Sequence, residues 1–145
     1  MSLSLVVNTK DLERLNKRMA DMADADHEAL LDSVGNLLAN SARERISDTK
    51  ITPDGAAWDA WSEGYAKTRN SGQSLLQSEG DLLDSIGHEV TGDSVLIGSN
   101  LVYAGVHDLG FAKKNIPART YLGISVEDEE AIAGEIDVWF EGLLQ

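Results

Sequence analysis

Apolar residues recur at helical spacing from the start of the chain. Between residues 9 and 23 they stand three or four positions apart, at Leu12, Leu15, Met19 and Met22. This spacing puts them on one face of a helix, so the segment is predicted to form an amphipathic helix. The segment from Asp24 to Asp26, with two acidic residues, interrupts the pattern.

A second and stronger apolar stripe follows this interruption. It consists of Leu31, Val34, Leu38 and Ala42, is widened by Leu30 and Leu37, and ends near Ile46. A helix from about Asp26 to Ser47 would be roughly 33 Å long at ~1.5 Å per residue. A stripe of this kind is typical of a scaffold helix that packs into a core, and it favours packing over a ligand role.

The character of the chain changes between residues 48 and 80. Pro53-Asp54-Gly55 is a turn signal, and the segment reads as a long, partly irregular excursion. Trp58 and Trp61, three residues apart, could share one face of a helical turn, with Tyr65 one turn further on. These aromatic residues either anchor the excursion to the domain or line a peptide or sugar cleft, and the first interpretation is favoured.

A β-hairpin is predicted after a short helix that starts at Gly80. Residues 85–91 and 94–99 alternate in polarity on either side of the turn residues Gly92 and Asp93. One face of the first strand carries Ile86, His88 and Val90, and one face of the second carries Val95 and Ile97.

The last third of the chain predicts two more helices. Residues 103–110 have room for two helical turns ended by Gly110, and a loop over residues 111–119 leads to an apolar stretch at 121–124. Ser125 is a predicted N-cap, with Asp128 at the third helical position. An apolar stripe follows, formed by Ile132, Ile136, Trp139, Phe140, Leu143 and Leu144. Gly134 and Gly142 each cost this helix about 1 kcal/mol, so packing must compensate.

Composition narrows the class of protein. The 145 residues fit a single domain, residues 1–145, with globular proportions of 42% hydrophobic and 26% charged residues. Without cysteine, disulfides and thiolate chemistry are excluded. The short apolar runs predict no membrane span and no secretion signal, so no membrane partner is expected. A net charge of -13 opposes attraction to phosphates, and no sequence-specific nucleic acid partner is expected.

Residues for catalysis are sparse. The histidines, His27, His88 and His107, are scattered without metal-ligand spacing, so neither a metal nor another cofactor is expected. His107 and Asp108 superficially resemble an acid-base pair, but sequence neighbours rarely orient each other as a catalytic dyad does. A hydrogen-bonded structural histidine is the favoured interpretation. Likewise, the acidic residues 128–130 predict a capped, solvated helix start and no general-acid pair, so no catalytic residue is expected.

Charge is unevenly distributed near the C-terminus. Seven acidic residues and no Lys or Arg follow from Glu127 onward, whereas Lys113, Lys114 and Arg119 cluster in one loop. Both segments can be solvated surfaces. Alternatively, the basic loop of one subunit meets the acidic helix of the next in a head-to-tail contact. Large aromatic residues and Arg are enriched at binding hot spots, which makes Trp58, Trp61, Lys113, Lys114 and Arg119 the interface candidates. Core packing is the alternative for the tryptophans.

An ordered set of short motifs runs through the middle and end of the chain. It comprises Ile51-Thr52-Pro53-Asp54-Gly55, Trp58, Leu75-Leu76, residues 78–82, Ser85-Ile86, Val95, Gly98-Ser99, Tyr103-Ala104, His107, Gly110, Ile116-Pro117-Ala118-Arg119 and Leu122-Gly123. Over about residues 40 to 135 this set resembles the phage virion morphogenesis family, which contains tail-completion proteins of Mu-like and P2-like phages. The segment from Tyr103 to Gly123 is its most recognisable part.

The resemblance implies an α+β domain with a long N-terminal helix, a small antiparallel sheet and a C-terminal helix. This agrees with the elements predicted above, a β-hairpin and an amphipathic C-terminal helix among them. It also implies a non-enzymatic, structural protein of the virion tail or neck, present in the bacterial host cytoplasm during assembly. Such a protein completes the tail and supports head-tail joining as a homo-oligomeric ring. Its expected partners are further copies of itself and the tail tube, tail terminator or connector.

Two alternatives belong to other classes of protein. One is a small hydrolase or toxin-like enzyme that uses His107 and Asp108. The other is an assembly chaperone that is absent from the finished virion.

Overall fold

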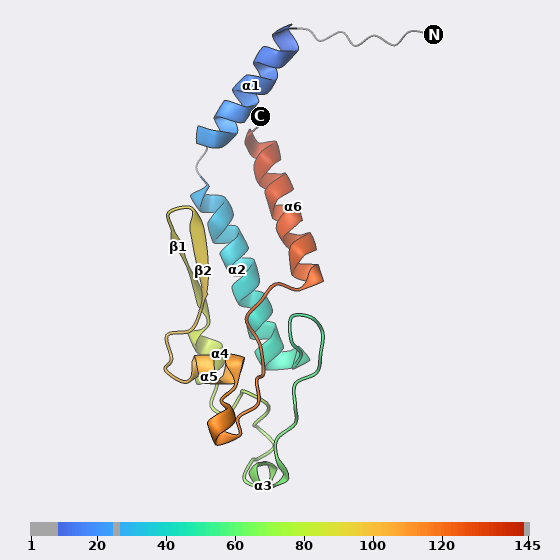
Figure 1. Cartoon of the computed structure of the whole chain (residues 1–145), viewed down its shortest axis with the longest axis vertical. Coiled ribbons are helices and arrows are strands. Elements are labelled where there is room, and N and C mark those ends of the chain that lie inside the picture. The colour runs from blue at the N-terminus through green and yellow to red at the C-terminus, as the bar shows by residue number, and fades with distance from the viewer. Residues whose placement is uncertain (1–8, 25–26, 144–145) are drawn as a thin grey trace, which may run out of the picture.

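Six α-helices and one β-hairpin form the chain in a computed structural model that describes residues 9–24 and 27–143 (Figure 1). The predicted α+β class is confirmed. In chain order the elements are α1 (Thr9–Asp24), α2 (Glu28–Glu44), the π-helical turn η1 (Arg45–Thr49), α3 (Glu63–Ala66), α4 (Asp81–Ser85), β1 (Gly87–Thr91), β2 (Ser94–Gly98), α5 (Ala104–Leu109), the 3-10 turn η2 (Ala112–Lys114) and α6 (Val126–Leu143).

Helix α2 is the centre of the body, with the hairpin on one side and α6 on the other (Figure 1). Strands β1 and β2 are antiparallel, and their register pairs His88 with Ile97 and Val90 with Val95, which lie on the predicted faces. The prediction is wrong for Ile86, which caps α4 and lies buried in the core before β1 begins. Gly35 lets the hairpin approach α2 closely, because a Cβ atom there would lie 2.5 Å from His88 Cδ2 and 2.6 Å from Val95 Cγ2. Glycine at this position therefore sets the separation of the two layers.

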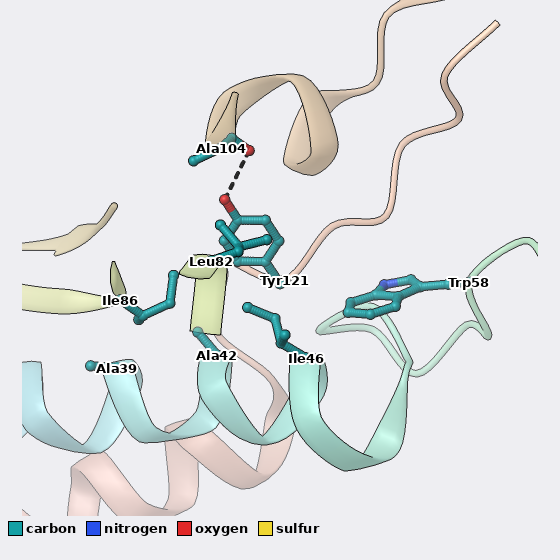
Figure 2. Packing of buried hydrophobic residues seen from close by; sticks show 8 residues of the cluster. All are labelled: Ala39, Ala42, Ile46, Trp58, Leu82, Ile86, Ala104 and Tyr121. Carbon is teal, nitrogen blue, oxygen red and sulfur yellow. Dashed lines mark hydrogen bonds between the residues drawn. The ribbon is translucent and has the colours of Figure 1, made fainter. Parts of the chain in front are cut away.

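The core lies at the C-terminal end of α2, where distant segments meet (Figure 2). Its buried members are Ala39, Ala42, Ile46, Trp58, Leu82, Ile86, Ala104 and Tyr121. The Tyr121 hydroxyl donates a hydrogen bond of 2.8 Å to the Ala104 carbonyl, so this buried polar atom is satisfied. Burial, together with the nearby Asp108 carboxylate, raises the pKa of Tyr121 to about 12.

The end of α2 is fixed by a lysine. The helix continues through η1 slightly beyond the predicted end at Ser47, and Lys50 then turns the chain with a left-handed φ of 54°. Its Nζ atom donates to the Ile46 carbonyl, to Ser74 Oγ at 3.0 Å and to the Leu75 carbonyl at 2.8 Å. Burial lowers the pKa of Lys50, although nearby Asp48 acts in the opposite direction. Lys50 thus ties the irregular excursion back to the scaffold helix.

The predicted cap of α6 is confirmed, with one correction. The Asp128 N–H donates to Ser125 Oγ and the Ser125 N–H donates to Asp128 Oδ2, both at 3.0 Å, which is a reciprocal capping box. However, Asp128 is buried, so the prediction of a solvated carboxylate is wrong at this residue. Its Oδ2 atom lies 2.7 Å from the Nη2 atom of buried Arg45 on α2, and its Oδ1 atom accepts from the Ser41 hydroxyl.

These contacts shift the ionisation of Asp128. Burial by itself raises the pKa of its carboxyl, but the hydrogen bonds from Ser41, Ser125 and Arg45 outweigh burial and hold the pKa below its usual value. The ionised carboxylate is therefore the form that fastens α6 to α2.

The predicted first helix is confirmed as α1, which projects beyond the body at the end opposite α3 (Figure 1). Within the described residues, α1 has no extended packing against another helix or strand. The side chain of Met22, residues 25–26 of the predicted interruption and Leu144 of the last stripe lie outside the described part of the structure.

The molecule exposes a large surface for its mass. Its accessible area is 10343 Å². A compact monomer of 15.7 kDa is expected to expose about 7300 Å². This area is that of all 145 residues; within the described part, the projecting helix α1 and the small core contribute to it because they leave much surface uncovered (Figure 1).

Candidate functional site

A groove of about 1340 Å³ lies around α3, at the end of the molecule opposite α1. Three segments form its walls: the excursion around residues 59–82, the start of α5 and the loop after α5. Its lining combines aromatic rings, cations and carboxylates, namely Trp61, Tyr65, Tyr103, Arg69, Lys114, Arg119, Asp59, Glu79 and Asp81. This mixture of apolar and charged groups suits contact with a protein surface.

The two tryptophans of the excursion have different places. Trp58 is buried in the core, and its indole N–H donates to the Thr120 carbonyl at 3.0 Å. Trp61 is half-buried and lines the groove, where its ring makes an edge contact with Tyr65 at 6.0 Å. Both residues precede α3, so the predicted shared helical face is wrong. Trp58 therefore packs in the core, which was the alternative to an interface role. A side chain enclosed in its own subunit has little surface left to contact a second subunit.

Arg119 is a structural side chain at the base of the groove. It is buried, and its guanidinium donates to the carbonyls of Asp59 at 2.9 Å and Ala60 at 3.1 Å. Burial lowers the pKa of Arg119, while Asp59 and Tyr65 act against that shift. These hydrogen bonds tie the excursion to the segment before α6, so Arg119 is engaged within its own subunit.

Lys113 and Lys114 remain exposed on η2, as an interface role requires. Lys114 also lines the groove, next to Asn115, which has a left-handed φ of 55°. Of the five interface candidates, Lys113 and Lys114 are thus exposed and Trp61 is half-buried, whereas Trp58 and Arg119 are buried.

His107 and Asp108 do not form a dyad in the structure. Asp108 Oδ1 accepts the backbone N–H groups of Tyr121 and Leu122, each at 3.0 Å, so this carboxylate holds the segment before α6. His107 lines the groove, and its buried Nδ1 atom has no hydrogen-bond partner in the described residues. The expectation of a hydrogen-bonded histidine ring is therefore wrong. Burial and, secondarily, Arg119 lower the pKa of His107, which favours the neutral imidazole.

The histidines lie in three separate places: at the start of α2, on the hairpin and in α5. His27 contacts the ring of Trp139 at 5.3 Å, and His88 Nε2 lies 2.8 Å from Asp32 Oδ1. Within residues 9–24 and 27–143, no group of three His, Cys, Asp or Glu side chains could hold a metal ion. None of the helices described there is both long and apolar enough to cross a membrane.

Sequence reasoning did not identify the contacts of Arg45 and Lys50. Both residues look like ordinary polar positions at the end of a helix, and their partners stand 83 and about 25 residues further along the chain. No local pattern joins such distant groups. The groove was missed for the same reason, since its walls come from three separate segments.

Comparison with known proteins shows to which protein family the chain is related. Residues 7–141 match the phage virion morphogenesis family. A relative from Escherichia phage Mu, named "Putative capsid assembly protein G", is 28% identical over 143 residues, and the alignment covers 91% of each chain. No solved structure is significantly similar. Because the family match covers nearly the whole of the folded body, the chain belongs to the phage virion morphogenesis family.

Proposed function

We propose that the protein is a structural part of the phage particle whose subunits associate into a ring. The ring completes the tail end or neck and supports the joining of head and tail. The observation that carries this proposal is the family match over residues 7–141. The large exposed area supports it, because a subunit that functions in an assembly leaves surface uncovered until its neighbours bind.

Charge fits a ring through which a genome passes. A net charge of -13 gives a surface that repels phosphates, so DNA would not adhere to the lumen during its passage. Trp61, Lys113 and Lys114, at the groove end, are the proposed contacts with the tail tube, the tail terminator or the connector. An aromatic residue beside exposed cations is a common composition for a protein-binding surface.

The arrangement of His107 and Asp108 supports a non-enzymatic function. An acid-base dyad requires the carboxylate to orient the imidazole. The Asp108 carboxylate instead accepts hydrogen bonds from the backbone N–H groups of Tyr121 and Leu122.

Light scattering coupled to size exclusion, followed by negative-stain imaging, tests the ring directly. We expect mass to rise with protein concentration towards a closed oligomer, and the protein to co-sediment with purified tail tubes. A strict monomer at high concentration that does not bind tail tubes would contradict the proposal.

The second candidate function is an assembly factor that leaves before the particle is finished. The name of the Mu relative, which refers to capsid assembly, favours it. Mass spectrometry of purified particles separates the two candidates, because a structural component is present at a fixed ratio to other virion proteins and an assembly factor is absent.

A further inference from the structure

We infer that α1 of one copy of the chain packs against the outer flank of α6 of a second copy. This inference rests on the proposed self-association and names the two surfaces that make it. The observations concern an uncovered apolar stripe on α1, an uncovered apolar flank on α6, the charges beside each, and the area available for contact.

The stripe on α1 is apolar and exposed. Leu12, Leu15 and Met19 lie on one face of the helix and are 47%, 53% and 60% exposed. Three large apolar side chains in a row on a projecting helix form a surface typical of a contact site, because burying them against a partner is favourable.

The outer flank of α6 consists of Ala133, Ile136 and Phe140. The inward face of the helix is marked by Asp128, which binds Arg45, and by Trp139, which contacts His27. At 3.6 residues per turn, the flank is rotated away from this inward row and towards solvent. Ile136 is accordingly 44% exposed and Ala133 is exposed, while Phe140 is half-buried.

An acidic row borders this flank. Glu130, Asp137 and Glu141 share the outermost face of α6, at spacings of seven and four residues, and all three are exposed. The described helix contains no Lys or Arg to balance them.

One positive charge of α1 is suited to that row. The helix carries four basic residues, Lys10, Arg14, Lys17 and Arg18, and four acidic ones, Asp11, Glu13, Asp21 and Asp24, so it is neutral overall, whereas α6 is strongly acidic. Arg18 stands three residues after Leu15, at the border of the apolar stripe. When the stripe of α1 packs against the flank of α6, apolar side chains meet apolar side chains. In the same contact the positive charge of Arg18 faces the acidic row. Lys113 and Lys114 offer charge without an apolar stripe at helical spacing, so α1 is the better counterpart of α6.

The exposed area is consistent with such contacts. For all 145 residues together it exceeds that expected for a compact monomer of this mass by roughly 3000 Å², and the uncovered surfaces of α1 and α6 are part of it. A subunit with two neighbours loses about 800 Å² to each in interfaces of standard size. Because the stripe and the flank are different surfaces of one chain, each copy binds one neighbour through α1 and another through α6. This head-to-tail contact forms a ring when the rotation closes.

Two variants of the full chain test the inference by complementation. Leu15→Glu disables the stripe and leaves the flank intact, whereas Ile136→Glu disables the flank and leaves the stripe intact. We expect each variant alone to be monomeric, with the apparent Kd raised roughly thirtyfold or more. Mixed in equal amounts, the two should form a dimer that grows no further, because only one intact stripe and one intact flank can meet.

Matched controls lie on the same helices. Ala20→Glu places a charge on α1 away from the stripe, and Val138→Glu does so on α6 at a residue that is 69% exposed and faces away from the flank. Both should assemble like the wild type. Circular dichroism must show that the variants fold, and Ala133→Glu replaces Ile136→Glu if the latter does not. A charge exchange, Arg18→Glu with Asp137→Arg, should restore the contact that Arg18→Glu alone weakens.

Several outcomes would overturn the inference. Wild-type assembly by Leu15→Glu would remove α1 from the contact, and self-association of Ile136→Glu would indicate that α1 pairs with α1. Loss of assembly in Lys113→Glu/Lys114→Glu, with Leu15→Glu unaffected, would assign the counterpart of α6 to the basic loop. In the first and third cases the proposed ring would stand with a different contact, whereas pairing of α1 with α1 is isologous and by itself closes a dimer. A wild-type chain that stays monomeric would instead contradict the proposed ring together with this contact.

Discussion

A buried ion pair fixes the position of the last helix at the residue scale. Arg45 and Asp128 are both almost fully enclosed, and Arg45 also donates to the Tyr121 carbonyl at 2.9 Å. Taking two charges out of water costs free energy, so the loss of one partner harms the fold more than the pair itself stabilises it.

Asp128→Asn is expected to destabilise the protein by about 3 kcal/mol at neutral pH, because Arg45 is left buried without its counter-charge. The pKa of Asp128 is lowered in the folded state, so its contribution is present above the ordinary carboxyl pKa and is lost as the pH falls through the folded value. Urea unfolding at pH 7 and at stepwise lower pH measures this. The difference between wild type and variant should shrink on acidification, and a constant difference would contradict the assignment.

His107 is expected to stay neutral at a pH where an ordinary histidine begins to be charged. Burial and Arg119 lower its pKa below the usual value of 6.5, so the unfolded chain takes up the proton first. Stability should therefore fall as the pH decreases from about 6.5 towards the folded pKa. NMR titration of the imidazole resonances gives the pKa. In His107→Gln this fall in stability below about pH 6.5 should be missing. The comparison is referenced to pH 8, where residue 107 is uncharged in both proteins.

At the scale of the elements, the parts that local sequence encodes were predicted well. Helix α2, the hairpin register and the cap of α6 each depend on residues within a few positions of one another, and all are confirmed. The sequence predicts that the excursion is irregular, but it does not predict that the Trp58 side chain lies in the core. Its indole hydrogen-bonds a carbonyl 62 residues away, and that tertiary contact outweighs local spacing. For the same reason the burial of Arg119 was not predicted.

Gly134→Ala is expected to stabilise α6. Gly134 lies inside the helix, and a Cβ atom there would meet nothing within 4 Å. Alanine should thus raise the free energy of unfolding by about 0.5–1 kcal/mol, through higher helix propensity and a less flexible unfolded chain. Thermal unfolding followed by circular dichroism measures the gain. Gly142→Ala, near the helix end, is the control and should give less. A lower Tm for Gly134→Ala would show that glycine is needed there for a contact.

At the scale of the whole molecule, α1 is an appendage of an otherwise complete body. The core lies at the other end of α2, and no described element packs extensively on α1.

Removal of residues 1–24 is therefore expected to leave the Tm of the body within about 2 °C of the wild type, since little buried area is lost. Differential scanning calorimetry at a concentration that keeps both proteins monomeric makes the comparison. The shortened chain should also fail to self-associate. A Tm lower by ten degrees or more would show that α1 supports the body within one subunit.

The length of the central helix has a consequence for how the protein handles several neighbours at once. With η1, α2 spans 22 residues, or roughly 33 Å, and it separates the groove from α1 (Figure 1). Under the proposed function, a copy of the chain bound at α1 and a different protein bound at the groove would occupy separate surfaces of one subunit. Neither would have to leave before the other binds, so the two attachments could be gained or lost in either order.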